Sequence, residues 1–379
     1  MMSKISNPIL KGFNPDPSII RVEDDYYIVT STFEWFPGCQ IHQSKDLIHW
    51  QLMNRPLERL SQLDIKGVPD SCGVWAPCLS HHEGIFYLLY TQVKSFDGQW
   101  KDTPNYLVTA TDINGPWSDP VFINASGFDP SLFHDEDGKS YVVNMLLDHR
   151  EGKLFGGVVL QEFDKETKQL LGNIHHIFAG TEHGGTEGPH IYQRNGYYYL
   201  MTAEGGTSYD HCITLARAKS IFGPYEVHPE NPFITAKYDE NNELQKTGHG
   251  DLVETQDGQW YGVFLTGRPL TTLGRCITGR ETAIEKVEWR DDGWLYLAYG
   301  GQTARKTVEA PHLAEHKFPA TKQRIHFDTP ALDINFQALR IPMTQDWVNQ
   351  TARPGHLRLV GRESLSSCFE QSMIARRVQ

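Results

Sequence analysis

The stretch YYIVTST at residues 26–32 is the first of five segments that begin at or beside an aromatic residue and continue as a β-rich apolar run. The other four are IFYLLYTQV (85–93), YVVNMLL (141–147), YYYLMTA (197–203) and WYGVFLT (260–266). Their starts are 59, 56, 56 and 63 residues apart, and a polar turn typical of hairpins precedes each one. The chain also has 33 glycines and 21 prolines, which favours many short strands over long helices. We therefore predict an all-β fold built on a repeat.

The length of the repeat indicates the kind of β fold. A period of about 58 residues has room for about four short strands and their turns, as in the blade of a β-propeller, although it is longer than the common blade repeats. Five copies predict a five-bladed β-propeller. A β-sandwich whose strands resemble one another by accident is the alternative. The regular spacing favours the propeller.

Charge and composition limit the partners and the compartment. The formal net charge of −12 disfavours nucleic acid and anionic membranes, because both require a basic face. No stretch has the apolar length of a membrane span and the N-terminus has no apolar signal-peptide core, so we expect a cytoplasmic protein. The six scattered cysteines form no CxxC pair, and we expect reduced, mostly buried thiols. A homo-oligomer is left open.

Five residues lie 10 to 12 positions before the aromatic segments and so hold equivalent places in the repeat: Asp16, Trp75, Asp129, Glu187 and His249. In a propeller these places lie on the innermost strands, which line the central axis. The predicted ring brings together three carboxylates, an indole and an imidazole. Like charges in a partly dehydrated funnel destabilise the fold, and such a cost usually marks a functional site.

Each of these residues also has a structural interpretation. Asp16 and Asp129 stand in Asp-Pro-Ser sequences, where Asp is often a turn or cap residue. Glu187 alone could be a solvated loop acid, and Trp75 could be a core residue. His249, between two glycines, could make an axial hydrogen bond or bind a metal. The shared position in the repeat favours a functional ring over these separate interpretations.

Carboxylates and aromatic side chains in one funnel are typical of carbohydrate chemistry. One carboxylic acid protonates the glycosidic oxygen, a second carboxylate activates water, and aromatic rings stack on the sugar. The sequence has no phosphate loop of the GxxxxGKS or GxxxxGKT type, no GxSxG elbow, and no CxxC or HExxH metal motif. We therefore predict a glycosidase that requires no cofactor and no metal, with an axial cation left open.

The longer motifs around these residues resemble those of the family 43 glycoside hydrolases, specifically the β-xylosidases that also act on α-L-arabinofuranosides. The matching stretches include NPILKGFNPDPSII (7–20), PDSCGVWAP (69–77), SGFDPSLFHDEDG (126–138), GTEGPHIY (185–192) and GRETAIEKVEW (279–289). The resemblance runs from about residue 5 to the end of the chain, and its motifs are long and specific.

The resemblance implies an inverting five-bladed propeller with three acidic site residues. Asp16 is then the general base, Glu187 the general acid, and Asp129 the residue that orients that acid. An ionised Asp129 would also raise the pKa of Glu187, which an acid catalyst needs near neutral pH.

Four further residues receive roles from the same resemblance. Phe33 and Trp75 line the sugar subsite, His249 is an axial histidine, and Arg280 contacts both the sugar and the acidic cluster. From the sequence alone, a surface salt bridge to a neighbouring glutamate, Glu281 or Glu285, is the alternative for Arg280.

With these residues in place, the resemblance implies an inverting exo-glycosidase that removes terminal β-1,4-linked xylose, and α-L-arabinofuranose, from short xylo-oligosaccharides. The alternative is a non-catalytic or impaired sugar-binding propeller, but the presence of all three acids favours catalysis. A propeller that binds proteins at its rim would have no reason to carry axial acids.

The domain prediction places the catalytic propeller in residues 1–322 and the truncated start of a β-sandwich module in residues 323–379. The segments FQALRIP and TARPGHLRLVGRESL resemble the opening strands of such a module. A sandwich of seven or more strands usually needs about 100 residues. We therefore expect unpaired strand edges in residues 323–379.

Overall fold

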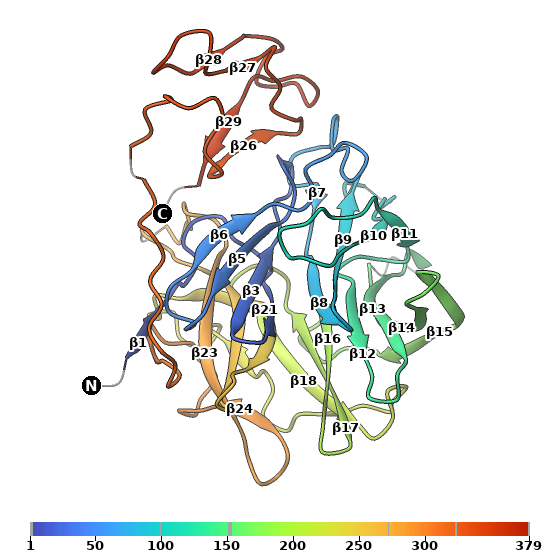
Figure 1. The fold of residues 1–379 in the computed structure, drawn as a ribbon. Helices are drawn as coiled ribbons and strands as arrows, with labels where there is room; N and C mark the ends of the chain where they lie inside the picture. The colour runs from blue at the N-terminus through green and yellow to red at the C-terminus, as the bar shows by residue number, and fades with distance from the viewer. Residues whose placement is uncertain (1–2, 99, 151–153, 272, 323, 378–379) are drawn as a thin grey trace.

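The computed structural model describes residues 3–98, 100–150, 154–271, 273–322 and 324–377. This part of the chain consists of β-strands and the loops between them, which confirms the all-β prediction (Figure 1). Gln323, where the predicted second module begins, lies outside the described residues.

Five antiparallel sheets follow one another along the chain. The first has β2 (Ser18–Val22), β3 (Asp25–Thr30), β5 (Gln40–Ser44) and β6 (Gln51–Asn54). The second has β8 (Cys78–His82), β9 (Ile85–Val93), β10 (Asn105–Ala110) and β11 (Val121–Asn124), with β7 (Gly73–Val74) also paired to β9. The third has β12 (Ser131–His134), β13 (Ser140–Leu147), β14 (Phe155–Asp164) and β15 (Gln169–Phe178).

The fourth and fifth sheets repeat this order. The fourth has β16 (Glu187–Arg194), β17 (Tyr197–Glu204), β18 (Cys212–Ala218) and β19 (Glu226–Val227), with β20 (Ile234–Thr235) also paired to β18. The fifth has β21 (Gln245–Glu254), β22 (Trp260–Gly267), β23 (Glu281–Trp289) and β24 (Leu295–Leu297). The five aromatic segments of the sequence are thus the second strands of the five sheets.

The turns before these second strands have the backbone that hairpins require. Asn195 and Gly196, between β16 and β17, have φ angles of 50° and 72°. Both lie in the left-handed region, as a type I′ turn demands. Glu83 and Gly84, between β8 and β9, have the same pair of positive φ angles, at 51° and 76°. The hairpins predicted at these turns are confirmed.

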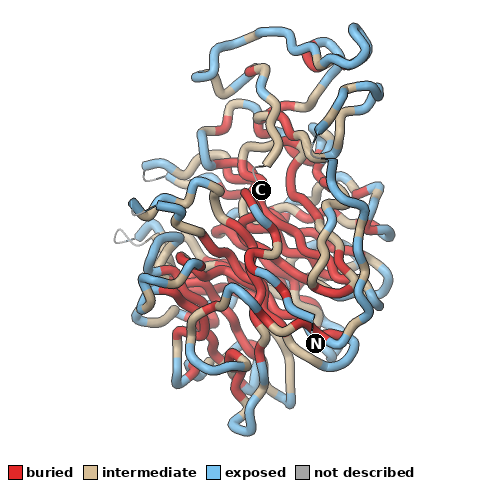
Figure 2. The backbone as a smooth tube through the Cα atoms, turned by 90° about the vertical axis from the view of Figure 1, so that its left-hand side faces the viewer, coloured by how far each residue is buried: buried red, intermediate tan, exposed pale blue. Residues whose placement is uncertain are grey.

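Apolar cores lie between neighbouring sheets. Leu88 and Leu89 are adjacent on β9 and point to opposite faces, so Leu88 packs in the core shared with the first sheet and Leu89 in the core shared with the third. Ile28 of β3 shares a core with Tyr261 and Val263 of β22, which joins the first sheet to the fifth. Figure 2 shows the buried backbone running through the sheets, whereas the C-terminal segment is largely exposed.

The first strands of the five sheets form a closed circuit of contacts. Strand β2 contacts β8, β8 contacts β12, β12 contacts β16, β16 contacts β21, and β21 contacts β2. This is a propeller-type arrangement, and it places the starts of these inner strands around one axis.

The N-terminal segment ties the start of the chain to the fifth sheet. Leu10 and Thr282 exchange backbone hydrogen bonds of 3.2 and 3.1 Å, and the N–H of Asn14 donates to the carbonyl of Arg280 at 2.8 Å. The buried side chain of Asn7 donates to the carbonyl of Ile284 and accepts from its N–H, at 2.7 and 2.9 Å. Strand β1 (Lys4–Ser6) pairs with β25 (Thr307–Glu309). The ring is therefore joined before the first sheet begins.

The C-terminal segment pairs with the first part of the chain. Strand β26 (Phe336–Leu339) lies between β29 (Ile374–Arg376) and β4 (Trp35–Phe36), and β27 (Val348–Asn349) pairs with β28 (Arg358–Leu359). The buried guanidinium of Arg340 donates to the carbonyl of Val68 at 2.7 Å and to Asp70 at 2.5 Å. The prediction of unpaired edges is wrong for β26, because the loop that carries β4 supplies its second partner.

Two further observations concern the cysteines and the membrane. All six cysteines are free thiols; Cys39, Cys72, Cys78 and Cys212 are buried, as predicted. Within the described residues, no helix is long and apolar enough to cross a membrane.

A buried carboxylate on the axis joins three of the inner strands. Asp251 of β21 accepts hydrogen bonds from the hydroxyl of Ser18 and the N–H of Ile19, both at 2.9 Å, in β2. It also accepts one from the hydroxyl of Tyr192, in β16, at 2.6 Å. The same carboxylate accepts from the N–H of Leu252 in its own strand at 2.8 Å, so Asp251 holds three inner strands in register.

We expect Asp251→Ala to lower the free energy of unfolding by at least about 3 kcal/mol, because each buried donor left without an acceptor costs roughly 1–3 kcal/mol. The measurement is chemical denaturation followed by tryptophan fluorescence. Glu254→Ala, at the exposed end of the same strand, is the matched control. A loss for Asp251→Ala no larger than for the control would contradict this assignment.

Candidate active site

One cavity at the starts of the inner strands contains all seven residues that the sequence analysis selected. Its volume is about 200 Å³, and it is lined by Asp16, Phe33, Trp75, Ala76, Phe96, Phe128, Asp129, Phe155, Glu187, Gly206, Thr207, His211, His249 and Arg280. The structure thus brings the three acids, the two aromatic rings, the histidine and the arginine to one place. Their roles stay predictions.

Asp16 and Asp129 have the same backbone conformation in two different sheets. Both have φ of 54°, in the left-handed region, and each stands two residues before the inner strand of its sheet. Asp tolerates this region better than most residues do, and the proline that follows disfavours a helical conformation. The turn interpretation is therefore correct for the backbone, while the side chains point into the cavity. Strained backbone of this kind is common at functional sites.

Asp16 is held by a hydroxyl and an arginine. The hydroxyl of Ser31 donates to its Oδ2 at 2.5 Å, and Nη1 of Arg280 lies 3.7 Å from its Oδ1. The surface salt bridge considered for Arg280 is wrong, because both neighbouring glutamates have other partners. Glu281 pairs with Arg268 at 2.5 Å and Glu285 pairs with Arg305 at 2.6 Å. Arg280 is thereby left to face the acids.

Asp129, Glu187 and His249 meet around one glycine. The N–H of Gly188, next to Glu187, donates to Oδ2 of Asp129 at 3.0 Å, and Nδ1 of His249 lies 3.7 Å from the same oxygen. Gly188 has φ of 56°, and a Cβ there would lie 2.9 Å from the His249 ring. Only glycine allows this approach. Asp129 therefore fixes the backbone that carries Glu187.

The cavity raises the pKa of two of its three acids. Burial, and then the charge of Asp16, raises the pKa of Glu187 from its usual 4.5 to about 8, while Arg280 acts against the rise. Burial, and then Glu187 and Asp16, raises the pKa of Asp129 well above its usual range. Burial and repulsion thus act on Glu187 and Asp129 together, and the role of Asp129 in raising the pKa of Glu187 stays a prediction. Burial also lowers the pKa of His249 to about 4, which leaves its ring neutral near pH 7.

Aromatic rings form one wall of the cavity. The Trp75 ring centroid lies 6.2 Å from that of Phe33, 4.6 Å from that of Phe96 and 5.1 Å from that of Phe128. Trp75 is half-buried and also packs against the core between the first two sheets, so the core and the subsite interpretations both describe it. Gly73 allows this wall to form, because a Cβ there would lie 2.3 Å from the carbonyl oxygen of Phe33.

The sequence analysis missed several lining residues, among them Phe96, Phe128, Phe155, Thr207 and His211. Phe128 directly precedes Asp129, so its position in the repeat could have identified it. His211 lies in a loop without a counterpart in the repeat and gave no signal. Its Nδ1 lies 3.0 Å from the carbonyl oxygen of Lys246, and its Nε2 has no partner among the described residues. A neutral imidazole, whose pKa burial lowers to about 4, can bond a sugar hydroxyl there.

Within the described part of the chain, no group of three or more His, Cys, Asp or Glu side chains is arranged to hold a metal ion. The polar groups of the cavity are instead arranged as hydrogen-bonding and charged pairs. Carboxyl groups of raised pKa, an arginine and an aromatic wall are the components that glycoside hydrolysis uses.

Comparison with known families agrees with this chemistry. Residues 5–295 match the family described as glycosyl hydrolases family 43. The chain belongs to glycosyl hydrolase family 43. Residues 324–379 of this family 43 hydrolase match the β-xylosidase C-terminal Concanavalin A-like domain.

Several relatives of this family 43 hydrolase are named for xylosidase or arabinosidase activity. It is 55% identical over 377 residues to the xylosidase/arabinosidase 43B of Humicola insolens. The aligned region covers 99% of this chain and 70% of that protein. It is 54% identical over 386 residues to a β-xylosidase of Bacillus subtilis. The aligned region covers 99% of this chain and 72% of that protein. The crystal structure of the xylan β-1,4-xylosidase from Bacillus halodurans superposes with a TM-score of 0.97 at 55% identity, over 99% of this chain and 72% of that one.

The raised pKa of Glu187 predicts how the stability of the family 43 hydrolase depends on pH. Between about 4.5 and about 8 the folded chain keeps a proton that the unfolded chain releases, so stability falls as the pH rises through this window. Glu187→Gln removes this proton. We expect the variant to gain stability over the wild type across the window by at least about 1.4 kcal/mol, the equivalent of one pKa unit.

The measurement is chemical denaturation at several pH values. Glu182→Gln, an exposed acid close to Glu187 in sequence, is the control and should follow the wild type. If the free energy of unfolding changed with pH in the same way for Glu187→Gln and for the wild type, Glu187 would have no raised pKa.

Proposed function

We propose that this chain is an exo-acting β-xylosidase that hydrolyses terminal β-1,4-linked xylose from short xylo-oligosaccharides and also releases α-L-arabinofuranose. Relatives at 54–55% identity, named as a β-xylosidase and a xylosidase/arabinosidase, support the substrate class. The observation that carries the proposal is the pairing of a protonated Glu187 with Asp16 beside Arg280 in one cavity.

The proposed reaction divides two proton transfers between two carboxyl groups. Glu187, protonated up to about pH 8, donates its proton to the glycosidic oxygen as the bond to the anomeric carbon breaks. Asp16 accepts a proton from a water molecule that attacks the anomeric carbon from the opposite face of the sugar. The products are a free xylose and a shortened oligosaccharide, so the reaction balances with water alone and needs no cofactor.

The remaining residues of the cavity have binding and positioning roles in this proposal. Asp129 positions Glu187 through the N–H of Gly188, and Arg280, 3.7 Å from Asp16, orients that carboxylate. The aromatic wall around Phe33 and Trp75 stacks on the sugar, as aromatic side chains do in carbohydrate sites. A cavity of about 200 Å³ is small beside typical ligand pockets of roughly 300–1,000 Å³, which suits one terminal sugar unit.

We also infer that the five sheets are the blades of one five-bladed propeller within residues 1–322. The closed circuit of inner strands and the core shared by the first and fifth sheets support this inference. Residues 323–379 belong, in this proposal, to a β-sandwich module, because residues 324–379 match a Concanavalin A-like domain and the described part of this segment consists of short β-strands and loops. A non-catalytic sugar-binding propeller is not favoured, since such a protein would not need two acids of raised pKa.

We expect Asp16→Ala and Glu187→Ala each to lower the hydrolysis of xylobiose by at least about a hundredfold, because general acid and base groups contribute roughly 10²–10⁴. The measurement is xylose release from unactivated xylobiose, since an activated aryl leaving group needs little protonation. Glu182→Ala is the control and should keep its activity. Near-normal turnover by either site variant would remove that residue from its role.

We expect the reaction to invert the anomeric configuration, because a base that activates water requires space between itself and the sugar. The two carboxyl groups should then lie roughly 6.5–9.5 Å apart in the complex with substrate. Proton NMR of the first product formed is the measurement, and it should show α-xylose from a β-xyloside. Appearance of β-xylose first would show retention and contradict the proposed role of Asp16.

A further inference from the structure

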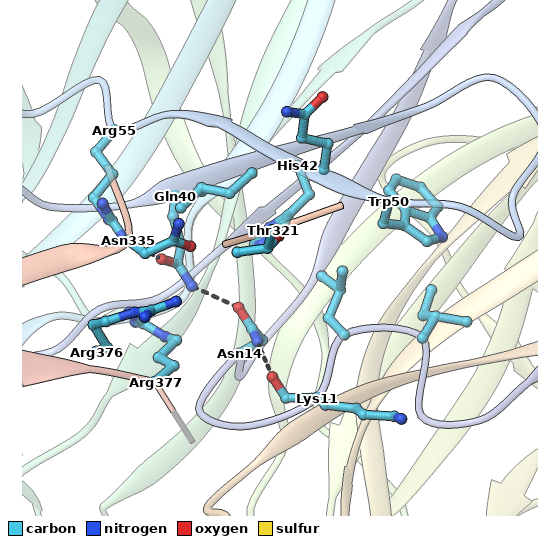
Figure 3. Close-up of a pocket in the computed structure, with 14 residues that line it drawn as sticks. Lys11, Asn14, Gln40, His42, Trp50, Arg55, Thr321, Asn335, Arg376 and Arg377 are labelled. Carbon is cyan, nitrogen blue, oxygen red and sulfur yellow. Dashed lines mark hydrogen bonds between the residues drawn. The ribbon is translucent and has the colours of Figure 1, made fainter. Parts of the chain in front are cut away.

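A second cavity, of about 240 Å³, lies between the first sheet and the C-terminal strands. Four of its lining side chains are basic: Lys11, Arg55, Arg376 and Arg377. Figure 3 shows Arg55, Arg376 and Arg377 on one side of this cavity and Trp50 on the other. None of the described residues that line it is Asp or Glu. The cavity is therefore cationic, in contrast to the acidic active site.

The guanidinium groups here bond only to uncharged acceptors. Arg55, which is 8% exposed, donates to the carbonyl of Ile334 and, at 3.1 Å, to the side-chain oxygen of Gln40. Arg377 donates to a backbone carbonyl and to the side-chain oxygen of Gln337. Burying a positive charge without a negative partner is costly. These two charges are thus oriented but not neutralised.

No carboxylate of the described chain compensates these charges directly. Asp333 attracts Arg55 and Arg376 from a distance, but it does not line the cavity. Its carboxylate accepts hydrogen bonds from the N–H and the side chain of Asn335, at 2.9 and 2.6 Å. None of the three arginines forms an ion pair with another described residue.

Three buried nitrogen atoms of the lining side chains have no hydrogen-bond partner in the described structure: Nε of Arg55, Nη2 of Arg377 and Nδ1 of His42. Buried polar atoms are nearly always bonded, so three unpaired donors or acceptors in one place leave hydrogen-bonding capacity unused around this cavity. Burial lowers the pKa of Arg55 to about 10 and, with the charge of Arg55, that of Arg377 to about 9. Burial and these two arginines lower the pKa of His42 to about 3. The charge of Arg55 therefore acts on Arg377, and the charges of both arginines act on His42.

We propose that this cavity is a binding site for a small oxyanion, supplied either by free phosphate or by the carboxylate of a sugar acid. Guanidinium groups bind both through paired, charge-assisted hydrogen bonds. The amide side chains of Asn14, Gln40 and Asn335 and the ring of Trp50 line the rest of the cavity and can contact the hydroxyls and ring of a sugar acid.

The oxyanion site and the active site share a wall. Arg377 donates to the carbonyl of Phe13, whose ring lies 5.5 Å from that of Phe33 in the sugar cavity. Asn14 lines the oxyanion site and stands two residues before Asp16. A bound oxyanion would therefore neutralise the arginines that pack behind the catalytic cavity without entering it.

The test is isothermal titration of the 379-residue chain, in the absence of xylo-oligosaccharide, with inorganic phosphate and separately with D-glucuronate. Sodium chloride keeps the ionic strength constant, so that general screening is excluded. We expect saturable binding at millimolar concentration or below and a melting temperature that rises with ligand concentration. Tighter binding of phosphate identifies free phosphate as the source, and tighter binding of glucuronate identifies a sugar acid.

Variants locate the binding to this cavity. Arg377→Gln should weaken binding at least about tenfold, because a charge-assisted pair of hydrogen bonds is lost. Arg376→Gln, at a half-buried position, provides the same test if Arg377→Gln does not fold. Arg358→Gln, an exposed arginine of the same C-terminal segment, is the matched control and should bind as the wild type.

Two outcomes would overturn the proposal. One is the absence of saturable binding of both ligands to the wild-type chain. The other is unchanged affinity in Arg376→Gln and in folded Arg377→Gln, which would place the oxyanion elsewhere. Neither result would affect the proposed hydrolysis, because binding is measured without substrate and the variants leave the three acids in place.

Discussion

The hydrogen bond from the N–H of Asn14 to the carbonyl of Arg280, at 2.8 Å, joins the beginning of the first sheet to the beginning of β23. It closes the circuit of sheets over more than two-thirds of the chain, and it sets Asp16 and Arg280 side by side. Every distance in the active site depends on this closure, because the three acids come from three different sheets. The hydrogen bonds of Asn7, Leu10 and the buried Asp251 also join the first part of the chain to the fifth sheet.

Closure also explains how the fold tolerates an acidic centre. Three carboxyl groups in a cavity of about 200 Å³ would repel one another if all were ionised. The structure avoids this by keeping protons on Glu187 and Asp129, whose pKa values burial raises, and by placing Arg280 beside Asp16. The protonation state that stabilises the fold near neutral pH is the state that an acid catalyst needs. Stability and chemistry therefore depend on the same burial.

The two cavities on either side of the segment around Asn14 differ in charge. The active site has three acids and one arginine, whereas the second cavity has basic side chains without a carboxylate among its described lining residues. The arginines of the second cavity lie behind residues 13–16, so neutralising them changes the potential at the active site. Electrostatic coupling of this kind falls off slowly inside a protein of low dielectric constant. The C-terminal strands thus contribute to the field around the active site as well as to its packing.

The sequence by itself determined the all-β class, the repeat, the hairpins and the set of seven residues that the structure brings to one cavity. The class, the repeat, the hairpins and five of the seven residues follow from local rules: alternation of apolar residues, turn chemistry and equivalent positions in a repeat. Phe33 and Arg280 came from the resemblance to the family 43 glycoside hydrolases. The tertiary structure decided the partner of Arg280, the cause of the raised pKa of Glu187, the pairing of β26 with β4, and the unpaired charges of Arg55 and Arg377. Each of these depends on contacts between residues far apart in the chain, and on burial. Neither is encoded in a local pattern, because the distance between two sheets and the water excluded from a cavity are fixed only when the ring closes.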